Sequence, residues 1–292
     1  MVMKISGQRA LQGKQWIGQI IIAFVLLVLM LVILFPFAFM LSLSFSTEAG
    51  YIKYGLTLFP RQITLSAYKA VITDSQVLRS LGNTIFITVV GSLMSIVFTV
   101  LMAYPLSKRD LPGGRIITCV CFLSMLFNGG IIPQLMIVID TGLSNTLFSL
   151  IIPFLISPWY LILMRNFFEM VPGGILEAAE IDGAGQLTIL SKFILPLSIP
   201  GVIAVLLFYA LQKWNEWFYA VLFISDENRW PLQVYIRNMF MTRMQGGMSE
   251  AGMLGDTYKN ALLMFSIIPL LLLFGFAQKY FVRGLTQGAI KS

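Results

Sequence analysis

Histidine is missing from this chain, and charged residues are scarce. Without histidine, the 292-residue sequence cannot hold a Ser-His-Asp triad, a histidine metal site or a histidine acid–base catalyst. Asp, Glu, Lys and Arg make up 11% of the residues, whereas a soluble domain carries about 25%. Hydrophobic residues make up 58%, so the composition indicates a protein that is solvated mainly by lipid.

Signals for nucleotides, nucleic acid and disulfides are also missing. No Gly-x-x-x-x-Gly-Lys-Ser/Thr phosphate loop occurs, so we expect no nucleotide site and no cofactor in this chain. The net charge of +7 does not indicate nucleic acid, because the basic residues are scattered at the ends of apolar segments, where they face anionic lipid. Cys119 and Cys121 are alternate residues of one apolar run and do not face each other, so we expect no disulfide.

Six apolar segments have the length that a bilayer requires, about 20 residues each. The basic N-terminus, with Lys4, Arg9 and Lys14, precedes the first of them. This segment is longer than the apolar part of a signal peptide and lacks a small-residue cleavage site, so we interpret it as an uncleaved span. The sequence predicts an all-α integral membrane protein, one transmembrane domain over residues 1–292 with spans at about 20–42, 84–104, 116–137, 147–166, 199–224 and 262–282.

The distribution of Lys and Arg predicts the orientation of these spans. Eleven basic residues lie on the side of the N-terminus and eight on the opposite side, with Lys213 left inside the fifth span. We therefore expect both termini, and the connection between the fourth and fifth spans, to be cytoplasmic. Two long connections, Ser44–Ser80 and Ser225–Lys259, then lie outside. Their aromatic residues are either ordinary membrane-interface residues or part of a docking surface for an external partner.

The connection over residues 172–196 is polar, in contrast to its surroundings. The sequence predicts a first helix with Pro172 in its first turn, where the missing N–H costs nothing. Gly183 predicts the end of this helix. A second helix should run from Thr188 and be stopped by Pro196 at the membrane.

One face of the first predicted helix carries small and apolar residues. Leu176, Ala179 and Gly183 follow a helical spacing, and a stripe of small residues permits close approach by another surface. Glu177 lies near the favourable end of the helix dipole. These patterns leave two alternatives open: an element that docks on a cytosolic partner, and an amphipathic helix that lies on lipid headgroups.

The same connection resembles the Glu-Ala-Ala loop of ABC importer permeases, which docks on the ATP-hydrolysing subunit. The sequence matches the family pattern at Glu177, Ala178, Ala179, Gly183, Leu195 and Pro196. It departs from the pattern at Phe193, where isoleucine is usual, and another large apolar side chain there should serve equally well. The resemblance implies that these residues couple the chain to a cytosolic dimer of ABC ATPases, which bind ATP and magnesium.

Further segments resemble the carbohydrate branch of that family, with maltose-permease-like topology. They are Ser44–Ser46, Ile132–Pro133, Arg165–Phe168, Trp214–Glu216 and Phe281–Thr286. Phe127–Gly130 and Trp230–Gln233 resemble permeases for complex oligosaccharides derived from pectin or alginate, most nearly the second permease of alginate importers. The resemblance implies import of oligosaccharides, acidic uronates included, across a bacterial inner membrane by alternating access. It also implies a heterodimer with a second homologous permease, and an extracytoplasmic solute-binding protein.

A polar cluster lies inside the fifth predicted span, at Lys213, Trp214, Asn215, Glu216 and Trp217. A charge within a membrane is costly and implies a pathway or a paired partner. Lys213 and Glu216 are one helical turn apart and can pair, and Trp217 follows on the same face. An aromatic ring beside polar donors can hold a sugar, and Lys213 could attract uronate carboxylates. The alternative is a buried pair that fixes helix packing. The resemblance favours this architectural role for Asn215 and Glu216, because Trp-Asn-Glu occurs generally in the family.

Other functions remain open from the sequence. An ABC permease can carry a peptide or an amino acid instead of a sugar, and an ion-coupled transporter works without an ATPase. An intramembrane transferase needs convergent carboxylates or a nucleophile–base pair, but Glu216 is the single carboxylate deep in a predicted span. Dependence of transport on ATP separates these classes.

Overall fold

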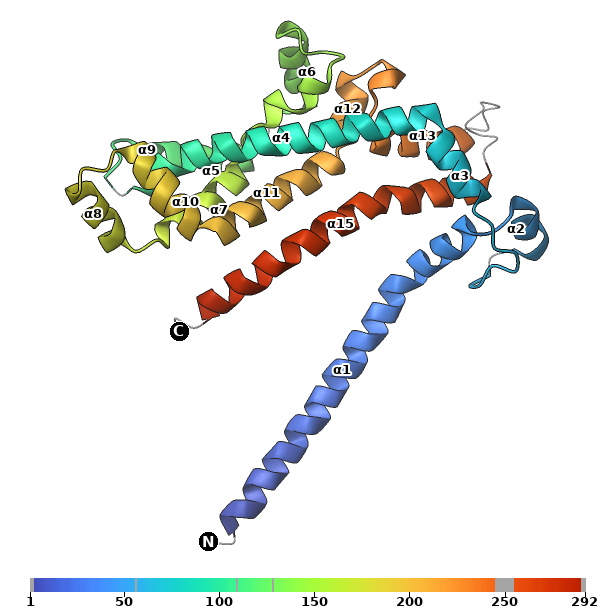
Figure 1. Cartoon of the computed structure of the whole chain (residues 1–292), viewed down its shortest axis with the longest axis horizontal. Coiled ribbons are helices and arrows are strands. Elements are labelled where there is room, and N and C mark those ends of the chain that lie inside the picture. Colours follow the sequence, from blue (N-terminus) through green and yellow to red (C-terminus); the bar gives the residue numbers. More distant parts are fainter. Residues whose placement is uncertain (1–2, 56, 109, 128, 245–254, 290–292) are drawn as a thin grey trace. The chain divides into compact units, whose positions relative to one another are not determined.

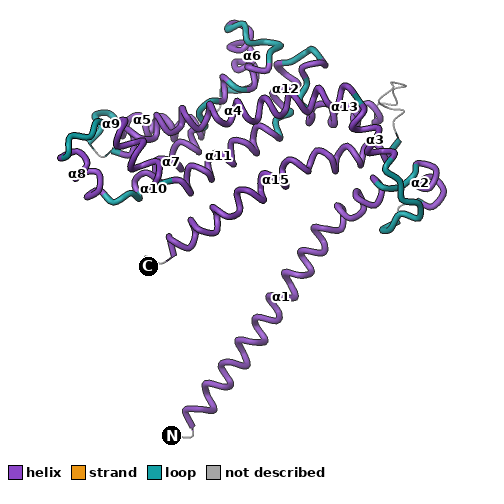
Figure 2. Tube along the Cα trace, viewed as in Figure 1, coloured by secondary structure: helices purple, strands orange, loops and turns teal. Residues whose placement is uncertain are grey.

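The computed structural model describes residues 3–55, 57–108, 110–127, 129–244 and 255–289, and Figures 1 and 2 show its helices. Within these residues every regular element is a helix, and one isolated bridge joins Ser46 to Ile63. The predicted all-α fold class is therefore confirmed. The chain divides into two structural units, residues 1–71 with 253–265 and residues 72–252 with 266–292.

The first unit is built around a long apolar helix. Its elements are α1 (Met3–Ser44), α2 (Glu48–Tyr54), most of α3 (Ser66–Thr73) and the start of α15 (Asp256–Ala289). The carboxylate of Glu48 accepts hydrogen bonds from the backbone N–H of Asp256 at 3.2 Å and from the hydroxyl of Thr257 at 2.7 Å. Because the first N–H groups of a helix lack partners within it, this carboxylate ties α2 to the first turn of α15.

The second unit holds the polar connection and the predicted second, third, fourth and fifth spans. Its elements are α4 (Ser75–Ser107), α5 (Gly114–Leu126), α6 (Ile131–Asp140), the 3₁₀ helices η1 (Leu147–Leu150) and η2 (Ile152–Phe154), α7 (Pro158–Glu169), α8 (Gly173–Ile181), α9 (Gln186–Ile189), the π-helix η3 (Leu190–Ile194), α10 (Leu195–Leu197), α11 (Ile199–Trp214), α12 (Phe218–Phe223), the 3₁₀ helix η4 (Glu227–Arg229), α13 (Leu232–Met244) and the rest of α15.

Helix α4 is the axis of this unit, because its buried face carries small polar residues that let other helices approach. The buried hydroxyl residues are Ser80, Thr84, Thr88, Ser92, Ser95 and Thr99. The hydroxyls of Thr99 and Tyr209 on α11 lie 2.8 Å apart, and Tyr209 also accepts a hydrogen bond from the N–H of Ser157 at 2.9 Å. Tyr209 therefore joins α4 and α11 to the N-terminal end of α7.

Several predicted spans are interrupted by bends. Among the described residues, three helices are long and apolar enough to cross a membrane: Gly18–Ser44, Ser75–Ser107 and Asp256–Gly275. The number reaches six if each bent pair is one span: Gly114–Leu126 with Ile131–Asp140, Leu147–Phe154 with Pro158–Glu169, and Gln186–Leu197 with Ile199–Trp214. The second of these pairs bends by 51°, at prolines that lack the N–H a continuous helix needs.

Candidate coupling and translocation sites

The first helix of the polar connection begins one residue later than predicted. Pro172 is not in the first turn but precedes it, with φ −59° and ψ 123°, and α8 starts at Gly173. At the other end, the N–H of Ala184 donates to the carbonyl of Ala179 at 2.9 Å, and the N–H of Gly183 donates to that of Glu180 at 3.0 Å. This pair of bonds is a Schellman motif, in which the residue after the helix takes a left-handed conformation. Gly183 has φ +79°, so glycine is required there by the backbone.

The small stripe of α8 faces the chain itself. Ala179 is 4% exposed and belongs to the core that contains Tyr104 and Ile189, and Leu176 packs against the same core. The prediction that this stripe is open to another surface is therefore corrected for Leu176 and Ala179. Glu177 and Ala178 are exposed instead. The small side chain of Ala179 is used here to pack α8 against the core of its own unit.

The apolar side chains that α8 and α9 expose form a different surface. Ile181, at the end of α8, is 86% exposed, and Leu187, in α9, is 75% exposed. Together with Glu177 and Ala178 they form what we call the exposed face of the connection. Ile181 and Leu187 are the most exposed large apolar residues of α8 and α9, which makes them candidates for contact with a partner.

The second half of the connection is longer than predicted. It begins at Gln186 rather than Thr188 and passes through the π-helix η3 into α10, which contains Pro196. Pro196 therefore does not stop the helix, which ends at Leu197. A wide turn and a kink are common where a proline removes a donor from the helix. The direction of the chain then changes by 84° between Gln186–Leu197 and Ile199–Trp214.

A polar cluster joins the end of α4 to the polar connection. Nζ of Lys108 donates to Oε1 of Glu180 at 3.2 Å and also to Oε1 of Gln186. Nε2 of Gln186 donates to Oε1 of Glu180 at 3.3 Å, and the hydroxyl of Tyr104 donates to Oε1 of Gln186 at 2.5 Å. The hydrogen bond from Gln186 and the ammonium of Lys108 lower the pKa of the Glu180 carboxyl below its ordinary value of 4.5.

Lys213 is buried among helices of its own unit. Lys213 is 3% exposed, and its Nζ donates a hydrogen bond to the carbonyl of Leu150 at 2.8 Å. Nζ also lies 5.5 Å from the centroid of the Phe154 ring. A Cβ on Gly91 would lie 3.4 Å from the methylene groups of Lys213, so glycine leaves room for this side chain beside α4. Lys213 therefore ties α11 to the 3₁₀ segment before α7.

Among the described residues, Glu216 is not within ion-pair distance of Lys213, although the two charges lie near enough to attract each other. Helix α11 ends at Trp214, so the one-turn spacing does not apply, and Oε1 of Glu216 accepts a hydrogen bond from the N–H of Tyr219 at 2.9 Å. The side chain of Asn215 donates to the carbonyl of Leu211 at 2.9 Å. These two polar residues finish one helix and start the next, which explains why the predicted span 199–224 is interrupted.

Trp217 lies apart from the buried Lys213 and Trp214. It precedes α12, is 42% exposed, and packs edge-on against Phe218 at a centroid distance of 5.7 Å. The guanidinium carbon of Arg237, on α13, lies 4.8 Å from the centroid of the Trp217 indole. Arg237 is one of the eight basic residues on the predicted outer side, and no spacing rule relates it to Trp217. Asn215 and Trp217 are the exposed members of the predicted cluster, and Trp217 has a guanidinium beside its ring.

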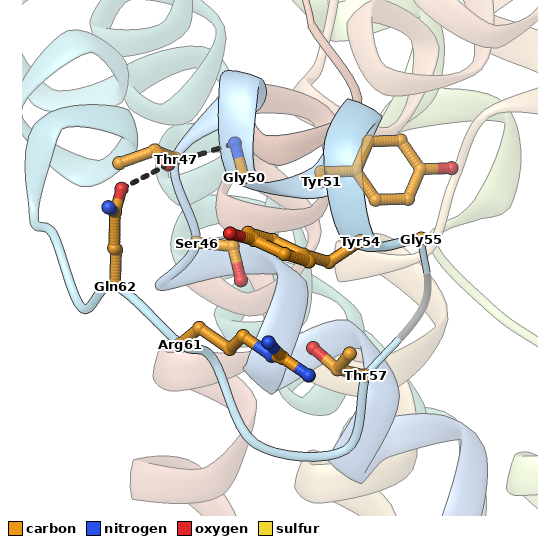
Figure 3. A pocket seen from close by; sticks show the side chains of 9 residues that line it. All are labelled: Ser46, Thr47, Gly50, Tyr51, Tyr54, Gly55, Thr57, Arg61 and Gln62. Atoms are coloured by element: carbon orange, nitrogen blue, oxygen red, sulfur yellow. Dashed lines mark hydrogen bonds between the residues drawn. The ribbon is translucent and has the colours of Figure 1, made fainter.

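A small pocket lies in the first unit, within the predicted outer connection (Figure 3). Its lining includes Thr47, Tyr54, Arg61 and Gln62. Oγ1 of Thr47 accepts a hydrogen bond from the N–H of Gly50 and donates to Gln62 at 3.3 Å, while the guanidinium of Arg61 lies 4.5 Å from the centroid of the Tyr54 ring. Its volume of about 20 Å³ admits about one water molecule, so a sugar ring does not fit.

The described part of the chain contains no candidate metal-binding site. Among those residues, no group of three or more Cys, Asp or Glu side chains could hold a metal ion, and Cys119 and Cys121 are free. The second unit is instead a set of packed helices with an exposed polar connection over residues 172–196. The fold thus defines a helical protein with three to six candidate membrane spans in its described residues and an exposed polar connection.

Comparison with known proteins identifies the family. Residues 84–287 match the family described as "Binding-protein-dependent transport system inner membrane component". Protein LplC of Bacillus subtilis (strain 168) is 38% identical over 261 residues, which cover 88% of each chain. The polygalacturonan/rhamnogalacturonan transport system permease protein YtcP of the same organism is 36% identical over 262 residues, covering 88% of this chain and 92% of YtcP.

A solved structure is similar over nearly the whole length. One chain of a bacterial ABC transporter involved in the import of the acidic polysaccharide alginate superposes with a TM-score of 0.81 and 33% identity, covering 91% of this chain and 96% of that one. The chain therefore belongs to the inner membrane components of binding-protein-dependent transport systems. It is a multi-pass permease subunit of a bacterial ABC importer, not an enzyme, and ATP is bound by a partner ATPase.

Proposed function

We propose that this chain is a permease subunit of an importer for oligosaccharides, acidic ones included, in the carbohydrate branch of its family. The observation that carries the proposal is similarity over nearly the full chain to proteins whose names specify polygalacturonan/rhamnogalacturonan transport and alginate import. Lower similarity, 27% identity, extends to the melibiose/raffinose/stachyose import permease MelC of Bacillus subtilis (strain 168). A neutral oligosaccharide is thus the second candidate, ahead of a peptide or amino acid.

The proposed assembly follows from the family and from the geometry of the polar connection. A second homologous permease pairs with this chain, two ATPase subunits bind from the cytosol, and a solute-binding protein delivers the sugar from outside. Both termini and residues 172–196 are cytoplasmic in this arrangement. The exposed face, with Glu177, Ala178, Ile181 and Leu187, is then the surface that meets an ATPase. Two of its side chains, Ile181 and Leu187, are large, apolar and exposed in a segment that must face water.

Movement of the ATPases would reach the membrane through the second half of the connection. Helices α9, η3 and α10 run without a break from Gln186 to Leu197 and turn sharply into α11. Displacement of α8 therefore shifts the start of α11, and the spans exchange between inward- and outward-open states by alternating access. ATP biases this equilibrium because the closed ATPase dimer holds α8 in one of the two positions.

We assign the sugar contact to Trp217 and Arg237 rather than to Lys213. Trp217 offers an exposed ring edge beside a cation, and an aromatic ring with polar donors suits a sugar. A guanidinium binds a carboxylate through two parallel hydrogen bonds, which favours a uronate. Lys213 is covered by Phe154 and bound to the Leu150 carbonyl, so its contribution is to packing.

Transport by the reconstituted complex tests the proposal. Vesicles with both permeases, the ATPases and the binding protein should take up radiolabelled uronate oligosaccharides only when ATP is inside. Replacing Arg237 by methionine should lower uptake of an acidic oligosaccharide about tenfold more than uptake of a neutral one, since a charge-assisted hydrogen bond is worth roughly 1.5–3 kcal/mol. Uptake without ATP would contradict the importer assignment. Equal losses for both sugars would contradict the role of Arg237.

A further inference from the structure

We propose that Lys108 clamps α8 to the end of α4, so that displacement of α8 moves α4 together with α11. The clamp consists of Tyr104, Lys108, Glu180 and Gln186. This inference rests on the proposed function of α8 as the surface that meets an ATPase. It assigns a positioning role to residues that take no part in the Glu-Ala-Ala pattern.

The clamp closes a joint in the chain. Residues 182–185 connect α8 to α9 and contain Gly183 and Gly185, and α8 packs against the core through Ala179 and Leu176. Glu180 lies near the end of α8 and Gln186 starts α9, and the same ammonium of Lys108 binds both of them. The hydrogen bond between Gln186 and Glu180 completes a triangle across the joint. One cation therefore fixes the angle between the two helices.

The clamp is anchored in the core of α4. Tyr104 is 7% exposed and belongs to the same buried core as Ala179 and Ile189. Its hydroxyl binds the Gln186 side chain, and its ring lies 5.4 Å from Nζ of Lys108. A buried aromatic residue holds the exposed polar groups in one arrangement. In Figure 1, α8 and α9 accordingly lie at the end of α4 that carries Ser107.

The clamp serves position rather than stability. The side chains of Lys108 and Glu180 are 35% and 49% exposed, and exposed ion pairs contribute little to folding. Without the clamp, α8 could turn at its glycine joint when an ATPase pulls on it, and α4 would stay behind. With the clamp, both ends of the joint and the end of α4 move as one body.

The N-terminal end of α4 is bound to the loop around Glu227, so movement of α4 would reach that loop. The side chain of Asn83 donates to the carbonyl of Trp230 at 3.2 Å, and Nε2 of Gln76 donates to that of Glu227 at 2.7 Å. Arg79 donates to the side chain of Asn228. Since α4 is one uninterrupted helix from Ser75 to Ser107, it links the clamp physically to the loop around Glu227, which the orientation places outside. A rigid element held at both ends can carry coupling between two sites.

Transport per ATP tests the clamp in the reconstituted four-protein complex. Lys108→Met should lower sugar transported per ATP hydrolysed about two- to thirtyfold, the range expected for loss of a coupling contact, while the complex still assembles. The double variant Lys108→Glu with Glu180→Lys should restore at least half of the loss. Lys192→Met is the control, because Lys192 is an exposed lysine of the same connection that lies outside the clamp. Unchanged coupling in Lys108→Met, or no rescue by the double variant, would overturn the proposal.

A second readout separates failure of the clamp from failure of the proposed function. Glu227→Cys, in a chain without Cys119 and Cys121, places one thiol on the outer loop and keeps the backbone carbonyl that accepts the hydrogen bond from Gln76 of α4. Vanadate trapping of the ATPases should change its rate of maleimide labelling, and Lys108→Met should abolish that change. If the chain with native Lys108 shows no change, coupling through α8 is itself wrong. If the change persists in Lys108→Met, the clamp alone is wrong.

Discussion

Replacing Gly183 by alanine tests how α8 ends and why a glycine stands there. With φ at +79°, Gly183 occupies a left-handed conformation, which costs a residue with a Cβ about 1–2 kcal/mol. A Cβ at this position would meet no atom within 4 Å, so the cost is one of backbone conformation and not of packing. This backbone cost weakens the two Schellman hydrogen bonds that end α8. A penalty of this size raises the fraction of molecules in which these bonds are broken about 5- to 30-fold.

Hydrogen exchange in the detergent-solubilised complex measures that fraction directly. In Gly183→Ala, the N–H groups of Asp182 and Ala184, which bond to Ala178 and Ala179, should exchange about 5- to 30-fold faster. Gly185→Ala is the matched control, since Gly185 is extended with φ −69° and equally open space; its exchange should not change. Native exchange rates in Gly183→Ala, or an equal increase in Gly185→Ala, would refute the reasoning.

Three further substitutions have outcomes that follow from single contacts. Gly201→Ala would place a Cβ closer than van der Waals contact to the ring of Phe167, and we expect a loss of about 1–3 kcal/mol, seen as a lower melting temperature of the complex. Lys213→Met leaves the Leu150 carbonyl unpaired, and should cost about 1–3 kcal/mol of stability while reducing uptake of acidic and neutral sugars equally; selective loss of acidic uptake would contradict the packing role. Because the pKa of the Glu180 carboxyl is lowered in the folded chain, the small stabilising effect of this exposed carboxylate should be full at neutral pH and disappear only below about pH 4.5. Melting curves of the native chain and Glu180→Gln should therefore converge in acid, and convergence as the pH rises would contradict the sign.

The sequence was most informative where local rules decide the structure. Apolar length predicts the long helices around Gly18–Ser44 and Ser75–Ser107, because backbone groups in lipid must be satisfied within a helix. Glycine after a polar helix predicts the end of α8, because few other residues adopt a left-handed conformation. These features need no knowledge of distant contacts.

Features that depend on tertiary packing could not be read from spacing. Ala179 fits a docking stripe and a core stripe equally well, and the position of Tyr104 decides between them. The expected pair of Lys213 and Glu216 assumes a continuous helix, whereas the capping bond from Tyr219 to Glu216 begins a new one. Two complete predicted spans, 116–137 and 147–166, separate Lys108 from Gln186 in the sequence, so no periodicity brings them together.

Photo-crosslinking from the exposed face of the connection is the most direct test of the central claim, that α8 couples the chain to an ATPase. A benzoylphenylalanine at Ile181, which is 86% exposed, should form an adduct with an ATPase subunit in the assembled complex. The same residue at Phe59, 80% exposed in the predicted outer connection, should form none with the ATPase. An adduct from position 181 supports coupling through α8. An assembled complex that yields no ATPase adduct from position 181, or yields one from position 59, would contradict the account.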